Sequence, residues 1–327
     1  MAASSLSKIV SRIKNGEICK IVILSGAGVS CNSGIPDFRS LGGLYDTLQP
    51  NLLTASEQEQ QYLSYEPTGV VDIRLFRQNQ FPYLEVRRPF ILGTAERTWK
   101  PTLAHVFSQL LSDKNLLRRV YTQNIDGLDH QLELDNKFIV NVHGSLGAVQ
   151  CEVCKADYNK ETFLAEVRAK IRNIYDPTDG PAVSENIYCN KCGRATVKPA
   201  TVLFGTALPK AYYKCVKEDF PQNVDLLIVA GTSLTVSPAC HLVNEVNATV
   251  PRVVINSDRV GEHLGLFLDN ERDVFLGMDI DEGFLLLTEE LGWTEDLFHY
   301  RYLMCDKSAA AIGKLHSRWQ REKEEAG

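Results

Sequence analysis

The chain has 327 residues, of which 44% are hydrophobic and 23% are charged, and its formal net charge is −6. This composition is ordinary for a globular protein, and the chain lacks the run of eighteen apolar residues that a transmembrane helix needs. An acidic chain is also a poor candidate for non-specific nucleic-acid binding, in which Lys and Arg neutralise phosphates. We therefore expect one large domain or two smaller ones, with neither a nucleic acid nor a membrane as partner.

Residues 1–19 lack the apolar core of a secretory signal. Their hydrophobic residues Leu6, Ile9, Val10 and Ile13 fall at helical spacing, which predicts an amphipathic first helix that covers the first strand. Because Ser, Lys and Arg are frequent there, a transit peptide is the alternative. We expect a cytoplasmic and/or nuclear protein, with a mitochondrial one as the less favoured reading.

The apolar run Ile21–Leu24 is short and rich in β-branched residues, which predicts a strand buried on both faces of a parallel sheet. Gly26 and Gly28 follow it, where backbone N–H groups can approach a pyrophosphate. The third glycine of the standard dinucleotide fingerprint would stand at Cys31, which argues against a nicotinamide oxidoreductase and leaves a simple turn as the alternative. The consecutive acid, ring and guanidinium of Asp37-Phe38-Arg39 favour a site for a charged heterocycle and a ribose.

The motifs GAGVS (26–30) and GIPDFRS (34–40) together resemble the opening motif of the sirtuins, the NAD-dependent protein-lysine deacylases. TQNIDGL (122–128) matches a second sirtuin motif residue for residue. His143-Gly144 resembles the catalytic His-Gly of that family. The resemblance covers roughly residues 6–295 and is strongest to the eukaryotic class I branch.

Several short apolar strands are followed by polar tips, at 25–28, 123–126, 143–144, 231–233 and 256–258. In a doubly wound sheet the carboxyl ends of the strands meet at one edge, so these tips should converge on a dinucleotide. We therefore predict an α/β fold, namely a Rossmann-like doubly wound parallel sheet with a smaller lobe made of a zinc-ribbon module and a helical insertion.

Two C-x-x-C pairs predict a metal site formed by Cys151, Cys154, Cys189 and Cys192. Four thiolates give zinc a closed tetrahedral site without an open position, so we expect one structural Zn²⁺. The total of nine cysteines is odd, which favours a reducing compartment over disulfides. The connecting segment 155–188 is longer than the common ribbon spacing, which leaves the shape of the module open.

The expected domain boundaries follow from these motifs. The Rossmann-like NAD-binding domain comprises 1–46, 96–147 and 200–305. The small domain comprises the helical insertion 47–95 and the zinc-binding module 148–199. The charged C-terminal tail, 306–327, is expected to form a solvated helix.

The resemblance to sirtuins implies catalytic roles for His143, Asn124 and Asp126. It also implies contacts with the cofactor NAD through Gly26, Ala27, Gly28, Ser30, Ile35, Asp37, Phe38, Arg39, Tyr45, Gln123, Asn124, Ile125, Asp126, Gly231, Thr232, Ser233, Asn256, Ser257 and Ile280. Val202, Phe204 and Gly205 would bind the substrate. Two positions depart from the family pattern, because Thr206 and Asp258 stand where the family has Glu.

The reaction that the resemblance implies begins when the carbonyl oxygen of an acyl-lysine attacks the ribose carbon as nicotinamide leaves. His143 then takes a proton from a ribose hydroxyl, and the products are nicotinamide, O-acyl-ADP-ribose and free lysine. The expected partners are acyl-lysine proteins or peptides, such as histone tails. A protein mono-ADP-ribosyltransferase and a non-catalytic zinc-bearing binding module are the alternatives.

Sirtuins that act on acidic acyl groups carry a Tyr-x-x-Arg pair. Tyr83 and Arg87 are one residue further apart than that pair. No acyl preference therefore follows from the sequence.

Overall fold

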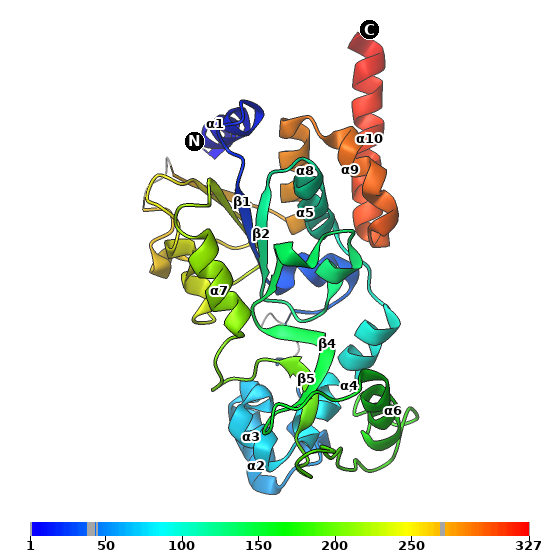
Figure 1. Ribbon diagram of the computed structural model, residues 1–327. Coiled ribbons are helices and arrows are strands. Elements are labelled where there is room, and N and C mark those ends of the chain that lie inside the picture. The colour runs from blue at the N-terminus through cyan, green and yellow to red at the C-terminus, as the bar shows by residue number, and fades with distance from the viewer. Residues whose placement is uncertain (1, 38–42, 44, 269–271, 327) are drawn as a thin grey trace.

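The structure is a computed structural model that describes residues 2–37, 43, 45–268 and 272–326. Its centre is a parallel sheet of six strands in the order β3-β2-β1-β6-β7-β8 (Figure 1). The strands are β1 (Ile21–Ser25), β2 (Leu117–Thr122), β3 (Ile139–Asn141), β6 (Leu226–Ala230), β7 (Arg252–Asn256) and β8 (Asp273–Gly277). The chain builds outward from β1 to β3 and then returns to the other side of β1, so the direction of winding reverses between β1 and β6. This order confirms the predicted doubly wound α/β fold.

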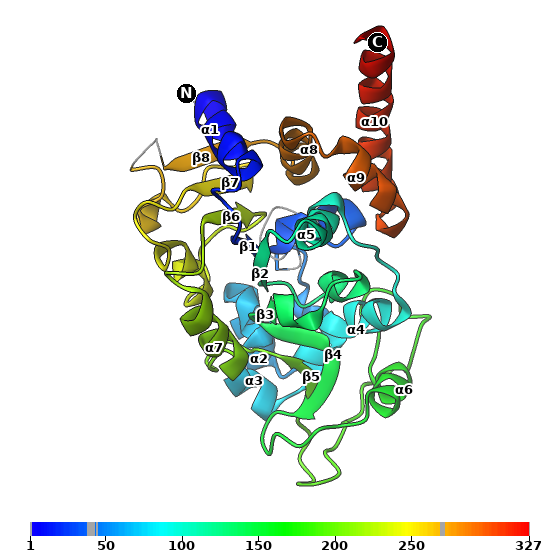
Figure 2. The same cartoon turned by 45° about the horizontal axis from the view of Figure 1, so that its top comes forward.

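Both faces of the sheet are buried, because successive side chains of each strand point in opposite directions. In β1, Ile21 and Ile23 join the core under the helices α1 (Ala2–Lys14), α5 (Leu103–Asp113), α8 (Ile280–Leu291), α9 (Thr294–His299) and α10 (Asp306–Ala326). Val22 and Leu24 join the opposite core, which α7 (Lys210–Asp219) helps to cover. Figures 1 and 2 show α7 and α5 on opposite sides of the strands.

A smaller lobe lies beyond the carboxyl edge of the sheet (Figure 1). It contains the antiparallel pair β4 (Gly144–Cys151) and β5 (Val197–Thr201) and the helices α2 (Glu57–Tyr65), α3 (Ile73–Gln78), α4 (Phe81–Glu96) and α6 (Lys160–Lys170). One hydrophobic cluster joins α4 to the cysteine-bearing segment, with Phe76, Leu84 and Phe163 almost fully buried. The two inserted segments of the chain therefore share a single core.

The sequence predicted the two terminal helices, α1 and α10, and the structure contains both. The predicted amphipathic helix is present as α1, which packs against α8 and β8 and shares one hydrophobic cluster with Ile21 and Ile23 of β1. Helix α10 was expected to be solvated, yet Ser308 and Ile312 in its first half are fully buried.

None of the helices in the described part of the chain combines the length and the hydrophobicity needed to span a bilayer.

Candidate active site

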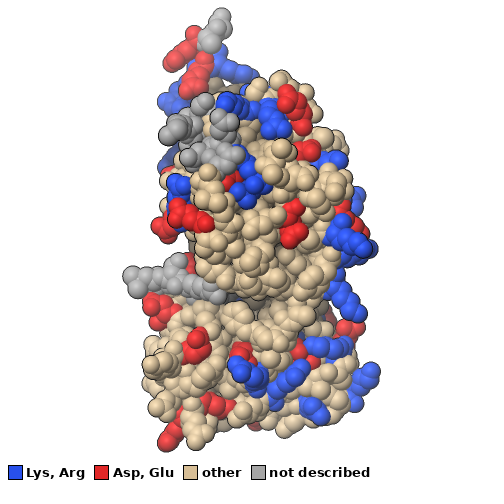
Figure 3. Space-filling model, turned by 90° about the vertical axis from the view of Figure 1, so that its left-hand side faces the viewer, with Lys and Arg blue, Asp and Glu red and all other residues tan. Residues whose placement is uncertain are grey.

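A cavity of about 500 Å³ opens where the sheet meets the small lobe, and we call it the interlobe cavity. It receives residues that follow β1, β2, β3, β6, β7 and β8 from one side and residues of α4 and β5 from the other. In Figure 3 a groove crosses one face of the molecule between its upper and lower parts, and uncharged side chains cover most of the surface above it. The polar tips that the sequence predicted to converge do meet here.

Most of the predicted site residues line the interlobe cavity: Gly26, Ala27, Gly28, Asp37, Tyr45, Gln123, Asn124, Ile125, His143, Val202, Phe204, Gly205, Gly231, Thr232, Ser233, Asn256, Ser257 and Ile280. Ser30, Ile35 and Asp126 are instead buried and do not line it. Phe38 and Arg39 lie outside the described residues.

The loops after β1 and β6 touch each other through glycines. Gly26 N–H donates to the carbonyl of Ala230 at 3.0 Å, and Gly28 N–H donates to that of Gly231 at 2.8 Å. A Cβ on Gly28 would lie 2.7 Å from the Cα of Gly231. A Cβ on Gly231, whose φ is +59°, would lie 2.5 Å from the nitrogen of Val29. These glycines are therefore required where two loops meet, and the N–H groups of Gly26 and Gly28 are already used within the protein.

A hydrogen-bonded chain of side chains supports the β1 loop from behind. Asn124 Nδ2 donates to the carbonyl of Gly26 at 3.0 Å and to Ser30 Oγ at 3.1 Å. Ser30 Oγ donates to Asp126 Oδ2 at 2.8 Å, and Leu128 N–H donates to Asp126 Oδ1 at 3.0 Å. Burial raises the pKa of the Asp126 carboxyl. Asp126 thus holds Ser30 and Asn124 in place rather than facing the interlobe cavity.

His143 directly precedes β4 and is half-buried in the wall of the interlobe cavity. Its Nδ1 lies 2.9 Å from the carbonyl oxygen of Gln123. A carbonyl only accepts hydrogen bonds, so Nδ1 carries the proton, and in the neutral ring the lone pair is on Nε2. The side chain of Gln123 donates to Thr232 Oγ1 at 3.0 Å, which fixes this residue between β2 and β6. The arrangement fixes the tautomer of the neutral ring and leaves Nε2 able to accept a proton.

The segment after β5 forms the floor of the interlobe cavity beside His143. Val202 N–H donates to the carbonyl of His143 at 2.8 Å. Phe204 pairs with the helical insertion, because its N–H donates to the carbonyl of Val71 at 2.9 Å and its carbonyl accepts from Ile73 N–H at 3.1 Å. An extended peptide that added to this segment would have to use the opposite edge, through the residues between these positions.

Two functional candidates, Tyr83 and Arg87, were considered in the sequence but received no role there. Tyr83 is 2% exposed and Arg87 is 5% exposed, and both line the interlobe cavity from α4. Tyr83 Oη lies 2.8 Å from Oγ1 of Thr201, the residue before Val202. One helical turn separates the tyrosine from the arginine, so both occupy one face of α4. Their i, i+4 spacing, which differs from the Tyr-x-x-Arg pattern, is the reason that the sequence left them without a role.

The four predicted metal ligands meet at one point of the small lobe. The sulfur atoms of Cys151, Cys154, Cys189 and Cys192 all lie within 4.8 Å of one another. Cys151 and Cys192 are 3.7 Å apart, and Cys154 and Cys189 are 3.6 Å apart. Tetrahedral Zn–S bonds of about 2.3 Å place sulfur atoms about 3.8 Å apart. The cysteines therefore fit one structural zinc ion with no position left for water.

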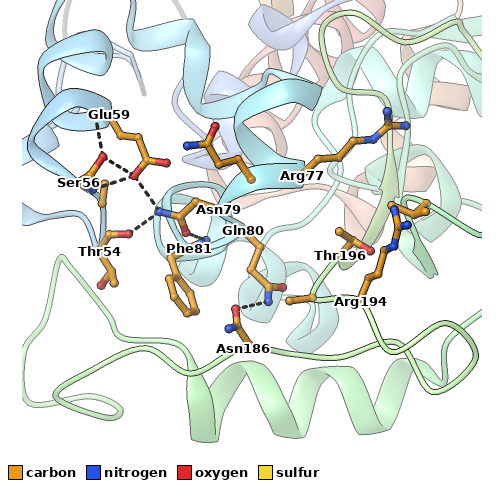
Figure 4. Close-up of a pocket in the computed structure, with 14 residues that line it drawn as sticks. Thr54, Ser56, Glu59, Arg77, Asn79, Gln80, Phe81, Asn186, Arg194 and Thr196 are labelled. Atoms are coloured by element: carbon orange, nitrogen blue, oxygen red, sulfur yellow. Dashed lines mark hydrogen bonds between the residues drawn. The ribbon is translucent and has the colours of Figure 1, made fainter.

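A second cavity, of about 740 Å³, lies between the helical insertion and the cysteine-bearing loops (Figure 4). In it, Asn79 Nδ2 donates to Glu59 Oε2 at 3.2 Å, and Gln80 Nε2 donates to Asn186 Oδ1 at 2.9 Å. Among the described residues, none lines both cavities. The second cavity is therefore separate from the candidate active site.

Comparison with known proteins gives consistent matches. The model of the Sir2 family matches residues 26–238. NAD-dependent protein deacetylase sirtuin-2 of Danio rerio is 34% identical over 310 residues, which cover 90% of this chain and 73% of that protein. NAD-dependent protein deacetylase sirtuin-3 of Mus musculus is 33% identical over 294 residues, covering 90% of this chain and 78% of that protein. NAD-dependent protein deacetylase hst2 of Schizosaccharomyces pombe is 32% identical over 297 residues, covering 90% and 79%.

Proposed function

This chain belongs to the Sir2 family, and from that premise we propose that it is an NAD-dependent protein-lysine deacetylase. The observation that carries the proposal is the meeting of His143 with the glycine loops after β1 and β6 in one cavity. The names of the similar proteins from three organisms support the same activity.

The residues of the interlobe cavity suit a dinucleotide. Its volume of about 500 Å³ lies in the usual range of ligand sites. In our proposal Ala27–Ser30 holds the pyrophosphate, Ile280 contacts the adenine, and Asn124 and Asp37 lie near the nicotinamide. The loops at 231–233 and 256–257 bind the remaining sugar and phosphate groups. When bound, NAD supplies the ribose carbon whose bond to nicotinamide is broken.

His143 is the proposed general base. With Nδ1–H held by the carbonyl of Gln123, the ring directs its basicity to Nε2, which accepts a proton from a ribose hydroxyl. Gln123 positions the hydroxyls, and Val202 and Phe204 line the channel for the acyl-lysine. Asp126 acts behind the wall, through its hydrogen bond to Ser30. The products of this reaction are nicotinamide, O-acyl-ADP-ribose and free lysine.

The zinc-binding cysteines have a structural role in this proposal. They hold the end of β4 next to the start of β5, and β5 leads into the substrate segment. Acetylated proteins, histone tails among them, are the proposed substrates, and the cytoplasm or nucleus is the proposed location.

A specific observation favours a wider choice of acyl group. Arg87 lies on the small-lobe side of the interlobe cavity, on the same face of α4 as Tyr83 and near the substrate segment. A guanidinium forms its strongest hydrogen bonds with carboxylates. We propose that the enzyme removes acyl groups that end in a carboxylate in addition to acetyl groups.

The test of the main proposal is His143→Ala. Loss of a general base lowers kcat by roughly 10²- to 10⁴-fold. The Kd for NAD should stay near the wild-type value, because the glycine loops are untouched. His130→Ala is the control, since His130 hydrogen-bonds Asn136 and Asn141 and does not line the interlobe cavity. Near wild-type turnover in His143→Ala would refute the assigned role.

A further inference from the structure

The C-terminal helix begins against the loop that we assign to the cofactor. The thiol of Cys305, directly before α10, donates to the carbonyl of Asn32 at 3.3 Å. Lys307 Nζ donates to the side-chain oxygen of the same asparagine at 2.5 Å. Asn32 belongs to the short helix Ala27–Ser33 that follows β1. The end of the chain therefore contacts the motif near its beginning.

Asn32 also connects α10 to the first turn of α8. Its Nδ2 donates to Asp279 Oδ1 at 3.2 Å, and that same oxygen accepts from the N–H of Asp281 at 2.9 Å and so caps α8. Ser308 of α10 donates to Asp281 Oδ2 at 2.5 Å in a buried hydrogen bond. Three elements are thus joined around one asparagine side chain, which we call the Asn32 joint.

The Asn32 joint lies directly behind one wall of the interlobe cavity. Cys31, the residue before Asn32, lines this cavity, and so do Asp279 and Ile280 at the start of α8. If Asn32 lost its hydrogen bonds and shifted, Cys31 on one side and Asp279 and Ile280 on the other would move with it. The position of the wall therefore depends on residues of α10 that do not line the cavity.

The positive charge of Lys307 also affects the electrostatics of this wall. Burial and the nearby carboxylates of Asp37 and Asp279 raise the pKa of the Cys31 thiol, whereas Lys307 acts in the opposite direction. Asp37 and Asp279 line the interlobe cavity and would repel a pyrophosphate. Lys307 offsets that repulsion from behind the wall.

We propose that Asn32 and Lys307 are positioning residues for the dinucleotide, so that α10 is a working part of the cofactor site. This inference rests on the proposed function. The residues act on the cofactor through Cys31, Asp279 and Ile280, and they leave His143 and the substrate segment unchanged.

The experiment compares Lys307→Met and Asn32→Ala with the wild-type enzyme. Loss of one hydrogen bond should raise the KM and the Kd for NAD roughly fivefold. The kcat and the KM for an acetyl-lysine peptide should not change. The double variant should lose less than the two single variants together, because both remove the same contact. Lys307→Arg, which keeps the charge and a donor, should restore most of the affinity.

Two variants on the same helix serve as controls. Lys314 is exposed on α10 and, in the part of the chain that the structure describes, makes no ion pair or side-chain hydrogen bond. Arg318 pairs with Glu289 of α8 at 2.5 Å, away from the Asn32 joint. Lys314→Met removes the same charge as Lys307→Met, and Arg318→Met loosens the attachment of α10. Both should leave the KM for NAD at the wild-type value.

Equal KM values for NAD in Lys307→Met and Lys314→Met would overturn the inference, as would a matching rise in Arg318→Met. Failure of the proposed function looks different, because the wild-type protein itself would then show no NAD binding and no deacetylation. That result would remove the inference as well.

Discussion

The two sides of the interlobe cavity are built in different ways. On the side of the sheet, backbone meets backbone, and the loops after β1 and β6 are too close for any side chain at Gly28 or Gly231. On the side of the small lobe, the wall consists of side chains such as Tyr83 and Arg87, held on a helix and a strand. The first side is therefore fixed by contacts between backbones, whereas the second side is made of side chains that a single substitution can change.

The largest expected effect comes from removing the zinc ion that stabilises the small lobe, because the sheet does not depend on it. Cys189→Ser should abolish zinc binding, whose free energy in structural sites is about 10–16 kcal/mol and is available for folding. The small lobe should lose its thermal transition while the core of the sheet keeps a separate one. Metal analysis and calorimetry measure this. A wild-type protein without zinc, or a variant with unchanged stability, would contradict the role of the four cysteines.

The next effect is on the side of the sheet. Gly231→Ala should cost about 3 kcal/mol or more, because left-handed backbone strain adds to overpacking against Val29. Gly16→Ala is the matched control: Gly16 also has positive φ, +75°, but a Cβ there would meet nothing within 4 Å. Only the first variant should also lose affinity for NAD. Equal unfolding free energies of the two variants in urea would show that the loops do not need this contact.

A pH effect tests a buried carboxyl group that lies close to Asp126 in the sequence. Burial raises the pKa of Asp129, three residues after Asp126, to about 6. The folded state therefore holds a proton that the unfolded chain releases near pH 4, and the free energy of unfolding falls as pH rises from about 4 to about 6. The contribution is at most about 3 kcal/mol. Asp129→Asn should remove it, so the variant should gain stability relative to wild type between these pH values.

Denaturation at pH 4 and at pH 7 measures the difference. If the wild-type protein and Asp129→Asn differ by the same amount at both pH values, Asp129 does not titrate in this way.

The smallest effect concerns the side of the small lobe. Arg87→Met should lower kcat/KM for a succinyl-lysine peptide roughly tenfold, the loss of one hydrogen bond between charged groups. The kcat/KM for the acetyl-lysine peptide should change less than twofold, so this second peptide serves as the control for the same variant. Equal losses on both peptides would mean that Arg87 only maintains the structure.

The contrast between the two sides of the interlobe cavity also explains which features could be predicted from the sequence. Strands such as Ile21–Ser25 are continuous apolar runs, and the tips after them are short polar motifs, so the sheet and its edge could be predicted. The four zinc-binding cysteines could also be predicted, because metal coordination fixes the spacing within each pair. These features depend on neighbours in the sequence.

Other features depend on packing between distant segments. Gly26 and Gly28 are also needed for contact with the loop after β6, some two hundred residues away, which the sequence alone does not reveal. The positions of Arg87 and of Lys307 follow from how α4 and α10 pack, which no local pattern encodes. The tail was expected to be solvated because its charges dominate the sequence, whereas the burial of Ile312 and Leu315 depends on how α10 packs.

The most direct test of the central claim is the product balance of the wild-type protein incubated with NAD and an acetyl-lysine peptide. Chromatography with mass detection should find nicotinamide, O-acetyl-ADP-ribose and deacetylated peptide in equal amounts. Formation of NADH, attachment of ADP-ribose to protein, or intact NAD after prolonged incubation would contradict the claim that His143 and the glycine loops form a deacetylase site.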